Sequence, residues 1–160
     1  MSAEEFKKSF ASITTINFPW GDLDAFGHVN NVQYFRYFET ARINYLNDVL
    51  DYQSVLKNPQ LAKWMPILAY ADAKYRRPLH YPDTILVGAS IEVMKENEFL
   101  MEYQIYSTEQ DTITTIGHGR VVTVDPKTSS RVTIPNEFIQ KILSAEEKAN
   151  RYPRMETDNN

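Results

Sequence analysis

The segment from Val32 to Leu50 constrains the fold more than any other part of the sequence. Its apolar residues recur at the spacing of a helix, and Tyr34 and Tyr37 widen the apolar stripe beyond one narrow face. A helix that is apolar around most of its circumference is usually buried. At 1.5 Å per residue this helix is about 30 Å long, close to the width of a small domain. The rest of the chain must therefore supply a sheet that wraps around it.

Strand patterns occupy most of the remaining chain. A first strand is expected from Ser12 to Phe18, where Pro19 ends it. Residues 85–93 alternate between apolar and other side chains, which is typical of a half-buried strand. Further strands are expected at 65–77, 99–107 and 113–124, and a C-terminal helix at 135–147. This order predicts an α+β fold with an antiparallel sheet of about five strands around the long helix.

Length and composition limit the organisation and the possible functions. The 160 residues fit one domain, with a core at about 13–147, and we expect residues 151–160 to fray. The net charge of −4 gives no reason to expect nucleic acid as a partner. The chain has no cysteine, which rules out disulfides and thiol nucleophiles. It lacks an apolar run of the ~18–20 residues that a membrane span needs, so we expect a cytoplasmic protein without membrane insertion.

The loop before the long helix carries the residues best suited to chemistry. Asp22, Asp24, His28 and two asparagines fall within ten positions, directly before the helix. Asn31 is the expected N-cap, because its side chain can accept a hydrogen bond from an N–H two or three residues on. Free N–H groups at a helix start can stabilise an oxyanion, and a nearby carboxylate can attack a carbonyl or activate water. The pattern therefore indicates an acyl-transfer site.

A resemblance to a known family is carried by the run Asp22-Leu-Asp24-Ala-Phe-Gly27-His28-Val-Asn30-Asn31-Val-Gln-Tyr34. This run resembles the hot-dog-fold acyl-CoA thioesterases of the 4-hydroxybenzoyl-CoA thioesterase type. It is also similar to the plant acyl-ACP thioesterases, which carry a comparable His-Val-Asn-Asn run. The likeness continues through Tyr75-Arg-Arg-Pro-Leu-His-Tyr-Pro-Asp83 and Val121-Val-Thr-Val-Asp-Pro126 to Ile134-Pro135.

The resemblance implies a hot-dog fold, in which the sheet wraps around a central helix. It implies a homodimer or homotetramer with the active site between protomers, an acyl-CoA or acyl-ACP substrate, and no metal or redox cofactor. By position, Asp24 matches the family's catalytic Asp, and His28 matches a histidine with a catalytic role in the plant branch. Asn31 matches the residue whose backbone N–H polarises the thioester carbonyl. Phe26 is a departure, since the plant enzymes carry a catalytic Asn there.

Further residues are candidates for substrate binding. Arg76 and Arg77 end a predicted strand, where they are either surface charges or a clamp for the phosphates of coenzyme A. Tyr34 belongs either to the core or to the acyl pocket. Glu39 is a reserve catalytic carboxylate, although an ion pair with Arg42, three residues on, is the simpler interpretation.

Two chemical alternatives stay open at the level of sequence. Asp24 can act as nucleophile or as general base in thioester hydrolysis. Asp22, Asp24 and His28 could also be hard ligands of a metal ion, but such sites usually need more ligands, and we expect none here. A non-catalytic acyl-thioester binding module and a hot-dog hydratase or dehydratase are the competing functions, because fold does not fix function.

Overall fold

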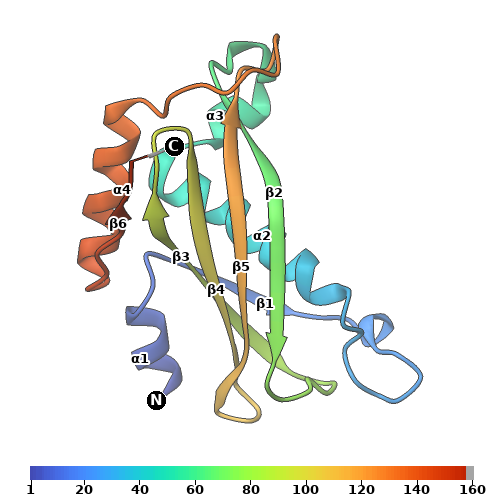
Figure 1. The fold of residues 1–160 in the computed structure, drawn as a ribbon. Helices are drawn as coiled ribbons and strands as arrows, with labels where there is room; N and C mark the ends of the chain where they lie inside the picture. The colour runs from blue at the N-terminus through green and yellow to red at the C-terminus, as the bar shows by residue number, and fades with distance from the viewer. Residues whose placement is uncertain (158–160) are drawn as a thin grey trace.

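The computed structural model describes residues 1–157 (Figure 1). In chain order, the elements are α1 (Ala3–Lys8), β1 (Ser12–Asn17), η1 (Trp20–Asp22), α2 (Gln33–Leu50), α3 (Gln53–Lys57), η2 (Pro59–Leu61), β2 (Met65–Tyr75), β3 (Thr84–Met94), β4 (Glu98–Ser107), β5 (Thr112–Val124), α4 (Asn136–Lys148) and β6 (Arg154–Met155). The long helix, the five main strands and the C-terminal helix all lie within a few residues of their predicted positions. No helix in this described part of the chain combines the length and apolarity needed to cross a membrane.

One sheet organises the molecule. Its strands lie in the order β1-β3-β4-β5-β2, and every neighbouring pair is antiparallel. The short β6 adds to β3 in parallel, beyond the end of β1. The long helix α2 crosses one face of the sheet (Figure 1). The predicted α+β architecture, with an antiparallel sheet around a central helix, is confirmed.

Large apolar side chains fix α2 against the concave face of the sheet. Phe38, Tyr45 and Leu46 of α2 are each at most 2% exposed. The Phe38 ring occupies the space that a side chain at Gly117 of β5 would need. Glycine in the middle of a strand often marks such a close approach. The same ring stacks on Tyr103 of β4, with 4.9 Å between centroids.

One side of α2 remains uncovered in the single chain. Phe35, Arg36 and Glu39 are exposed, so the expectation of burial around most of the circumference is wrong for the monomer. The neighbouring β2 is an edge strand that pairs only with β5. Four of its large apolar or aromatic side chains are more than 40% exposed: Ile67, Leu68, Tyr70 and Tyr75. Exposed apolar residues on an unpaired edge mark a surface that other chains can contact.

Residues near both ends of the chain contact the sheet. Helix α1 begins with a capping box between Ser2 and Glu5, a signal that the sequence offers in its Ser-x-x-Glu spacing. The expected fraying is wrong for residues 151–157, where β6 pairs with β3. The Arg151 guanidinium lies over the Phe10 ring at 4.0 Å and hydrogen-bonds the Ser9 carbonyl. The last three residues of the expected frayed segment, 158–160, lie outside the described residues.

Candidate active site

The loop between β1 and α2 is shaped by the side chain of Asp24. Its Oδ1 accepts the backbone N–H of Phe26 at 2.8 Å and that of His28 at 3.3 Å. The backbone reinforces the turn, since the Asp24 N–H donates to the His28 carbonyl at 2.7 Å. Gly27 takes a φ of 79°, which glycine adopts without strain. Asp24 is therefore a turn-forming residue, but Oδ2 makes no hydrogen bond within residues 1–157 and remains available for chemistry.

Asp24 opens onto a cavity at the start of α2. The cavity has a volume of about 280 Å³. Loop, helix and β2 all contribute to its lining, which consists of Asp24, His28, Val29, Asn31, Tyr34, Tyr75, Arg76, Arg77 and Pro78. The six residues predicted as catalytic or substrate-binding thus line one cavity, although they come from segments more than forty positions apart.

The helix start differs from the prediction in one respect. Asn31 is not the N-cap, because the helix begins at Gln33 and no side chain caps it from Val32. Asn30 instead accepts N–H groups at the helix start. Its Oδ1 accepts the Val32 N–H at 3.2 Å, and its carbonyl accepts the Gln33 N–H at 2.9 Å. The Asn31 N–H makes no hydrogen bond within the described chain. An unused donor at the positive end of a helix dipole can bind a developing negative charge.

Tyr75 holds the helix start against β2. Its hydroxyl donates to the Asn31 carbonyl at 2.8 Å, and its ring packs edge-on against Tyr34 at 4.8 Å. Burial, with a smaller contribution from the nearby Tyr75 and Asp24, raises the pKa of Tyr34 to about 12. Tyr34 is therefore a neutral phenol at pH 7. Tyr75 was not predicted as a site residue, although it stands directly before the two predicted arginines.

Two further side chains of the loop have partners that sequence spacing did not indicate. The Asp22 carboxylate accepts the Tyr37 hydroxyl at 2.8 Å, which ties the loop to the second turn of α2. The His28 ring packs edge-on against His80, with 4.8 Å between centroids. His80 lies fifty-two positions away, so only the β2–β3 connection brings it to the site. Among residues 1–157, no three His, Asp or Glu side chains converge as they would around a metal ion.

The two arginines that follow β2 are fixed through their backbone N–H groups, while their guanidinium groups form no ion pair with a described residue. The N–H groups of Arg76 and Arg77 both donate to the Thr114 carbonyl, at 2.9 and 3.1 Å. Both side chains are exposed, and neither forms an ion pair with a described residue. Two unpaired guanidinium groups at the rim of a cavity can bind an anion such as phosphate.

Glu39, the reserve carboxylate, lies outside this cavity. It lines a neighbouring one and pairs with Arg36 at 3.0 Å, so the expected pair with Arg42 is wrong. Arg42 instead donates to the Tyr103 hydroxyl at 3.1 Å. Both members of the Glu39–Arg36 pair are at least half exposed, which makes the pair a weak one. Asp24 is accordingly the better placed of the two carboxylates.

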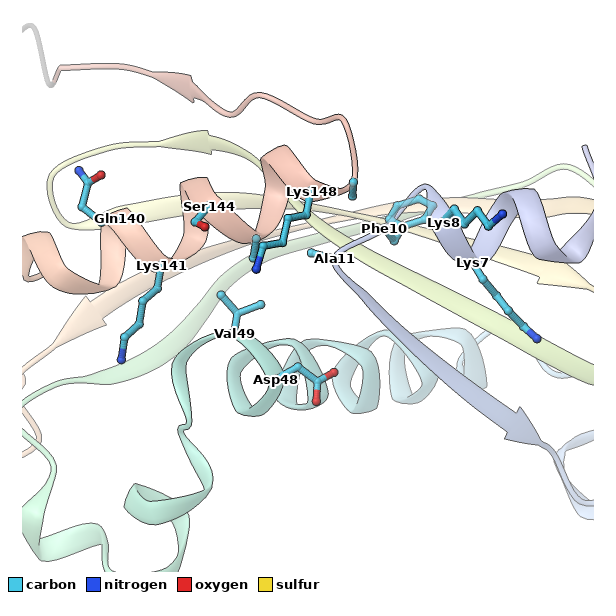
Figure 2. Close-up of a pocket in the computed structure, with 12 residues that line it drawn as sticks. Lys7, Lys8, Phe10, Ala11, Asp48, Val49, Gln140, Lys141, Ser144 and Lys148 are labelled. Atoms are coloured by element: carbon cyan, nitrogen blue, oxygen red, sulfur yellow. The ribbon is translucent and has the colours of Figure 1, made fainter.

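A larger cavity lies elsewhere, at the opposite end of α2. Figure 2 shows this groove of about 940 Å³, with lysines from α1 and α4 around it. Its lining contains one carboxylate, Asp48, which accepts the Ser12 hydroxyl at 2.7 Å. The groove lacks every residue predicted for the site and any histidine that could act as a base. Its size alone does not make it an acyl-transfer site.

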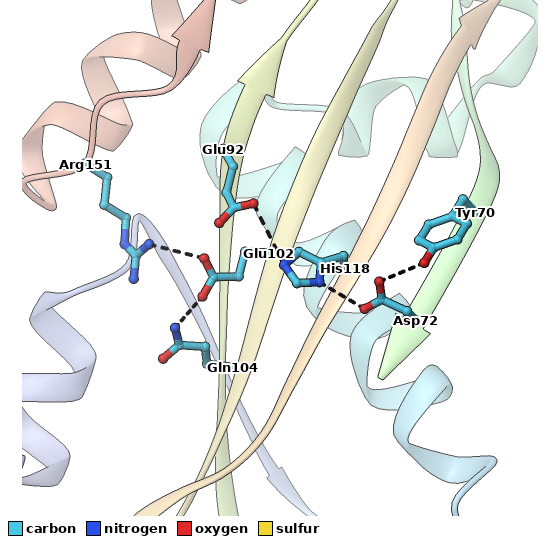
Figure 3. Close-up of polar contacts among 7 residues, drawn as sticks. All are labelled: Tyr70, Asp72, Glu92, Glu102, Gln104, His118 and Arg151. Atoms are coloured by element: carbon cyan, nitrogen blue, oxygen red, sulfur yellow. Dashed lines mark hydrogen bonds and ion pairs between the residues drawn. The ribbon is translucent and has the colours of Figure 1, made fainter. Parts of the chain in front are cut away.

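A polar network crosses the convex face of the sheet, also away from the Asp24 cavity. Figure 3 shows His118 of β5 between Asp72 of β2 and Glu92 of β3. His118 Nδ1 lies 2.9 Å from Asp72 Oδ1, and its Nε2 lies 3.9 Å from Glu92 Oε2. The pKa of Glu92 is raised to about 7, mainly by a hydrogen bond with Glu102 and next by burial. These groups tie four strands together and do not border the Asp24 cavity.

Known proteins share both the sequence pattern and the fold. The profile of the thioesterase-like superfamily matches residues 18–142. A putative esterase of Aquifex aeolicus is 28% identical over 119 residues, which are 74% of this chain and 88% of that protein. The protein YsmA of Bacillus subtilis, itself uncharacterised, is 42% identical over 45 residues, 28% of this chain and about a third (31%) of its own length.

Solved structures share the fold. A thioesterase of Thermus thermophilus, solved with coenzyme A and zinc, superposes with a TM-score of 0.74 at 22% identity, covering 87% of this chain and 96% of that one. The profile match begins directly after β1 and extends into α4, so it includes every residue that lines the Asp24 cavity. The chain therefore has the hot-dog fold, belongs to the thioesterase-like superfamily and is a thioester hydrolase.

Proposed function

We propose that this protein is an acyl-CoA thioesterase that hydrolyses an acyl thioester to the free acid and coenzyme A. The observation that carries the proposal is the Asp24 cavity, which is lined by a carboxylate and a helix start. Within residues 1–157, one oxygen of the carboxylate and one N–H of the helix start have no hydrogen-bond partner. A carboxylate and an oxyanion donor that face one carbonyl are the two groups that acyl transfer needs.

In the proposed reaction, the thioester carbonyl oxygen accepts the Asn31 N–H, where the helix dipole stabilises the negative charge that develops. Asp24 Oδ2 then either attacks the carbonyl carbon or takes a proton from an attacking water. Direct attack gives a mixed anhydride and expels the thiolate, and water later cleaves the anhydride. Either route adds one water and releases one thiol and one acid.

His28 serves the reaction from the same loop. It lines the cavity next to Asp24, and imidazole exchanges protons readily near neutral pH. We assign it the role of orienting water or protonating the departing thiolate. The His80 ring packs edge-on against the His28 ring, with 4.8 Å between centroids.

The two arginines bind the nucleotide end of coenzyme A. Arg76 and Arg77 line the cavity, their guanidinium groups form no ion pair with residues 1–157, and the nucleotide end of coenzyme A carries several negative charges. The Thermus thermophilus relative is described as a complex with coenzyme A, which supports this class of substrate.

The proposal includes a homo-oligomer. Strand β2 presents an unpaired edge of 11 residues, and the apolar side chains of Ile67, Leu68 and Tyr70 are exposed beside it. A second copy that pairs along this edge would cover the open side of α2 and lie over the Asp24 cavity. Size-exclusion chromatography with light scattering tests this part, and a monomer at micromolar concentration would overturn it.

The activity is tested by the release of free thiol from acetyl-, octanoyl- and benzoyl-CoA, followed with a thiol reagent. A thioesterase releases thiol in proportion to enzyme. Tight binding of these esters without thiol release would establish a binding module instead. Consumption of an enoyl-CoA without thiol release would establish a hydratase.

A further inference from the structure

The backbone N–H of Asn31 is the unused donor in a segment whose other donors are engaged. The N–H groups of the two residues before it donate to the carbonyls of Leu79 and Asp22, both at 2.9 Å. Those of the two residues after it donate to Asn30, through its side chain and its carbonyl. Only the Asn31 N–H is without a hydrogen-bond partner in this segment, as far as residues 1–157 are concerned.

Two peptide groups meet at Asn31, and they are anchored differently. The first carries the Asn31 N–H, and its carbonyl, that of Asn30, accepts the Gln33 N–H at 2.9 Å. This contact lies inside the helix start and moves with it. The second is anchored from the sheet, because the Asn31 carbonyl accepts the Tyr75 hydroxyl at 2.8 Å. In the described chain, Tyr75 is the one sheet residue whose side chain hydrogen-bonds the segment 29–33.

Tyr75 is itself fixed in place. It is the last residue of β2 and pairs with Thr115 of β5. Its ring packs edge-on against that of Tyr34, which is 2% exposed, with 4.8 Å between centroids. Burial raises the pKa of Tyr75, so its hydroxyl keeps the proton at neutral pH and acts as a donor. Strand pairing and ring packing therefore hold the hydroxyl that fixes Asn31.

The position of an oxyanion donor matters for catalysis. Such a donor must lie about 2.7–3.1 Å from the place where the oxyanion forms. A misplacement of about 1 Å can cost about 10²-fold in rate. Arg76 and Arg77, the proposed phosphate-binding residues, follow Tyr75 directly in the chain. Tyr75 thus links the strand end that would bind the nucleotide to the N–H that would polarise the carbonyl.

We propose that Tyr75 is a positioning residue, whose hydroxyl aligns the Asn31 N–H with the carbonyl of a thioester that is bound at the end of β2. This inference rests on the proposed thioesterase function and deepens it, since Tyr75 acts on the reaction through Asn31. The contact lies within one chain and needs no free surface. A second copy that covers the edge of β2 leaves it in place.

Tyr75→Phe removes the hydroxyl and keeps the ring packed on Tyr34. For the ester that is hydrolysed fastest, we expect kcat to fall about five- to thirtyfold and KM to change less than about twofold, because complete loss of an oxyanion donor costs about 10²–10³-fold. The pH dependence of kcat/KM should keep its shape, since Tyr75 transfers no proton. Tyr70→Phe is the matched control: it removes a hydroxyl of the same strand, which donates to Asp72 at 3.0 Å, and should leave kcat unchanged.

The infrared band of the bound thioester carbonyl gives a measure that does not depend on turnover. A donor that polarises a carbonyl lowers its stretching frequency. Benzoyl-CoA that is isotope-labelled at the carbonyl carbon should therefore show a lowered frequency when bound to Asp24→Asn. Adding Tyr75→Phe to this variant should move the band back toward the frequency of the free ester, whereas adding Tyr70→Phe should not.

The outcomes separate this inference from the proposed function. Unchanged kcat and an unchanged carbonyl band in Tyr75→Phe would remove the role of Tyr75 and leave the thioesterase function intact. A raised KM at constant kcat would make Tyr75 a direct substrate contact, and an altered pH profile would make it a proton donor or acceptor; either contradicts positioning.

A fall in melting temperature or a change in oligomeric mass well beyond that of Tyr70→Phe would assign Tyr75 a structural role instead. An unshifted carbonyl band in Asp24→Asn alone would show that the Asn31 N–H is not the donor, which also ends the inference. Absence of thiol release from every ester by the unaltered protein would refute the proposed function itself.

Discussion

Two carboxylates, one near each end of α2, lie in opposite surroundings. Glu146 of α4 contacts the C-terminal half of α2 through Tyr45 and is fully buried. It accepts three hydrogen bonds: from the Tyr45 hydroxyl at 2.7 Å, the Ser90 hydroxyl at 2.9 Å and the Ile91 N–H at 2.9 Å. Before the N-terminus of α2, Asp24 is partly exposed and uses only one oxygen. A carboxylate whose acceptor sites are filled holds a structure together, whereas one with a free oxygen at a cavity is available to a substrate.

The largest expected effect tests the Asp24 side of this contrast. Asp24→Asn keeps the oxygen that accepts from Phe26 and His28 but removes the nucleophile or base. We expect thioester hydrolysis to fall by about 10²–10⁴-fold with little change in melting temperature. Thiol release and thermal unfolding measure the two quantities. Asp51→Asn, at the exposed C-cap of the same helix, is the control and should retain full activity.

For Glu146 we expect the reverse, a loss of stability without a loss of activity. Glu146→Gln places an amide N–H₂ among three donors, and we expect a loss of about 2–3 kcal/mol in the free energy of unfolding. Urea denaturation measures this loss, with the exposed neighbour Glu147→Gln as the control. The specific activity of the folded fraction should stay the same. A variant that keeps its stability but loses activity would erase the distinction between the two carboxylates.

A smaller effect is expected at the rim of the Asp24 cavity. Replacing both Arg76 and Arg77 by Ala should raise KM for acyl-CoA by about three- to tenfold at low salt, because exposed charge pairs are individually weak. The effect should shrink as ionic strength rises. Acyl-pantetheine lacks the nucleotide, so its KM should not change. Equal effects on both substrates would mean that the arginines do not bind the phosphates.

The smallest effect concerns the network on the convex face. The pKa of Glu92 is raised to about 7, mainly by its hydrogen bond with Glu102, so the folded state holds a proton that the unfolded state releases near pH 4.5. Its contribution to stability is therefore present below pH 4.5 and lost as the pH rises to 7. Since Glu92 is a third exposed, the change is at most about 1 kcal/mol after solvent screening.

Glu92→Gln should flatten the dependence of unfolding free energy on pH between 5 and 8. The lowered pKa of Glu102 acts in the opposite direction, with a contribution that is lost only as the pH falls below its normal value. A variant with an unchanged slope between pH 5 and 8 would show that Glu92 does not hold the proton.

Sequence reasoning reached the fold because periodicity is a local signal. The helix at Gln33–Leu50 and the strand at Thr84–Met94 were predicted within one or two residues, since alternation and helical spacing are visible in short windows. Residues 151–157 were misjudged because their order comes from β3 and Phe10, which lie far away in the chain.

The candidate site was predictable in its residues but not in its contacts. Asp24, His28 and the two arginines line one cavity, although the sequence left the arginines open between surface charges and a phosphate clamp. The hydrogen bond to the helix start was expected from the Asn31 side chain and is made by that of Asn30, because neighbouring asparagines offer the same chemistry and only backbone geometry chooses between them. Similarly, Glu39 had an arginine three residues away on either side, and spacing alone could not tell which one pairs with it.

The most direct test of the central claim is a crystal structure of the Asp24→Asn variant with an acyl-CoA that it cannot hydrolyse. The account predicts that the thioester carbonyl oxygen lies within about 3 Å of the Asn31 N–H, with the side chain of residue 24 in reach of the carbonyl carbon or of one bridging water. A thioester bound elsewhere, or a side chain at position 24 that points into bulk solvent in the assembled oligomer, would contradict it.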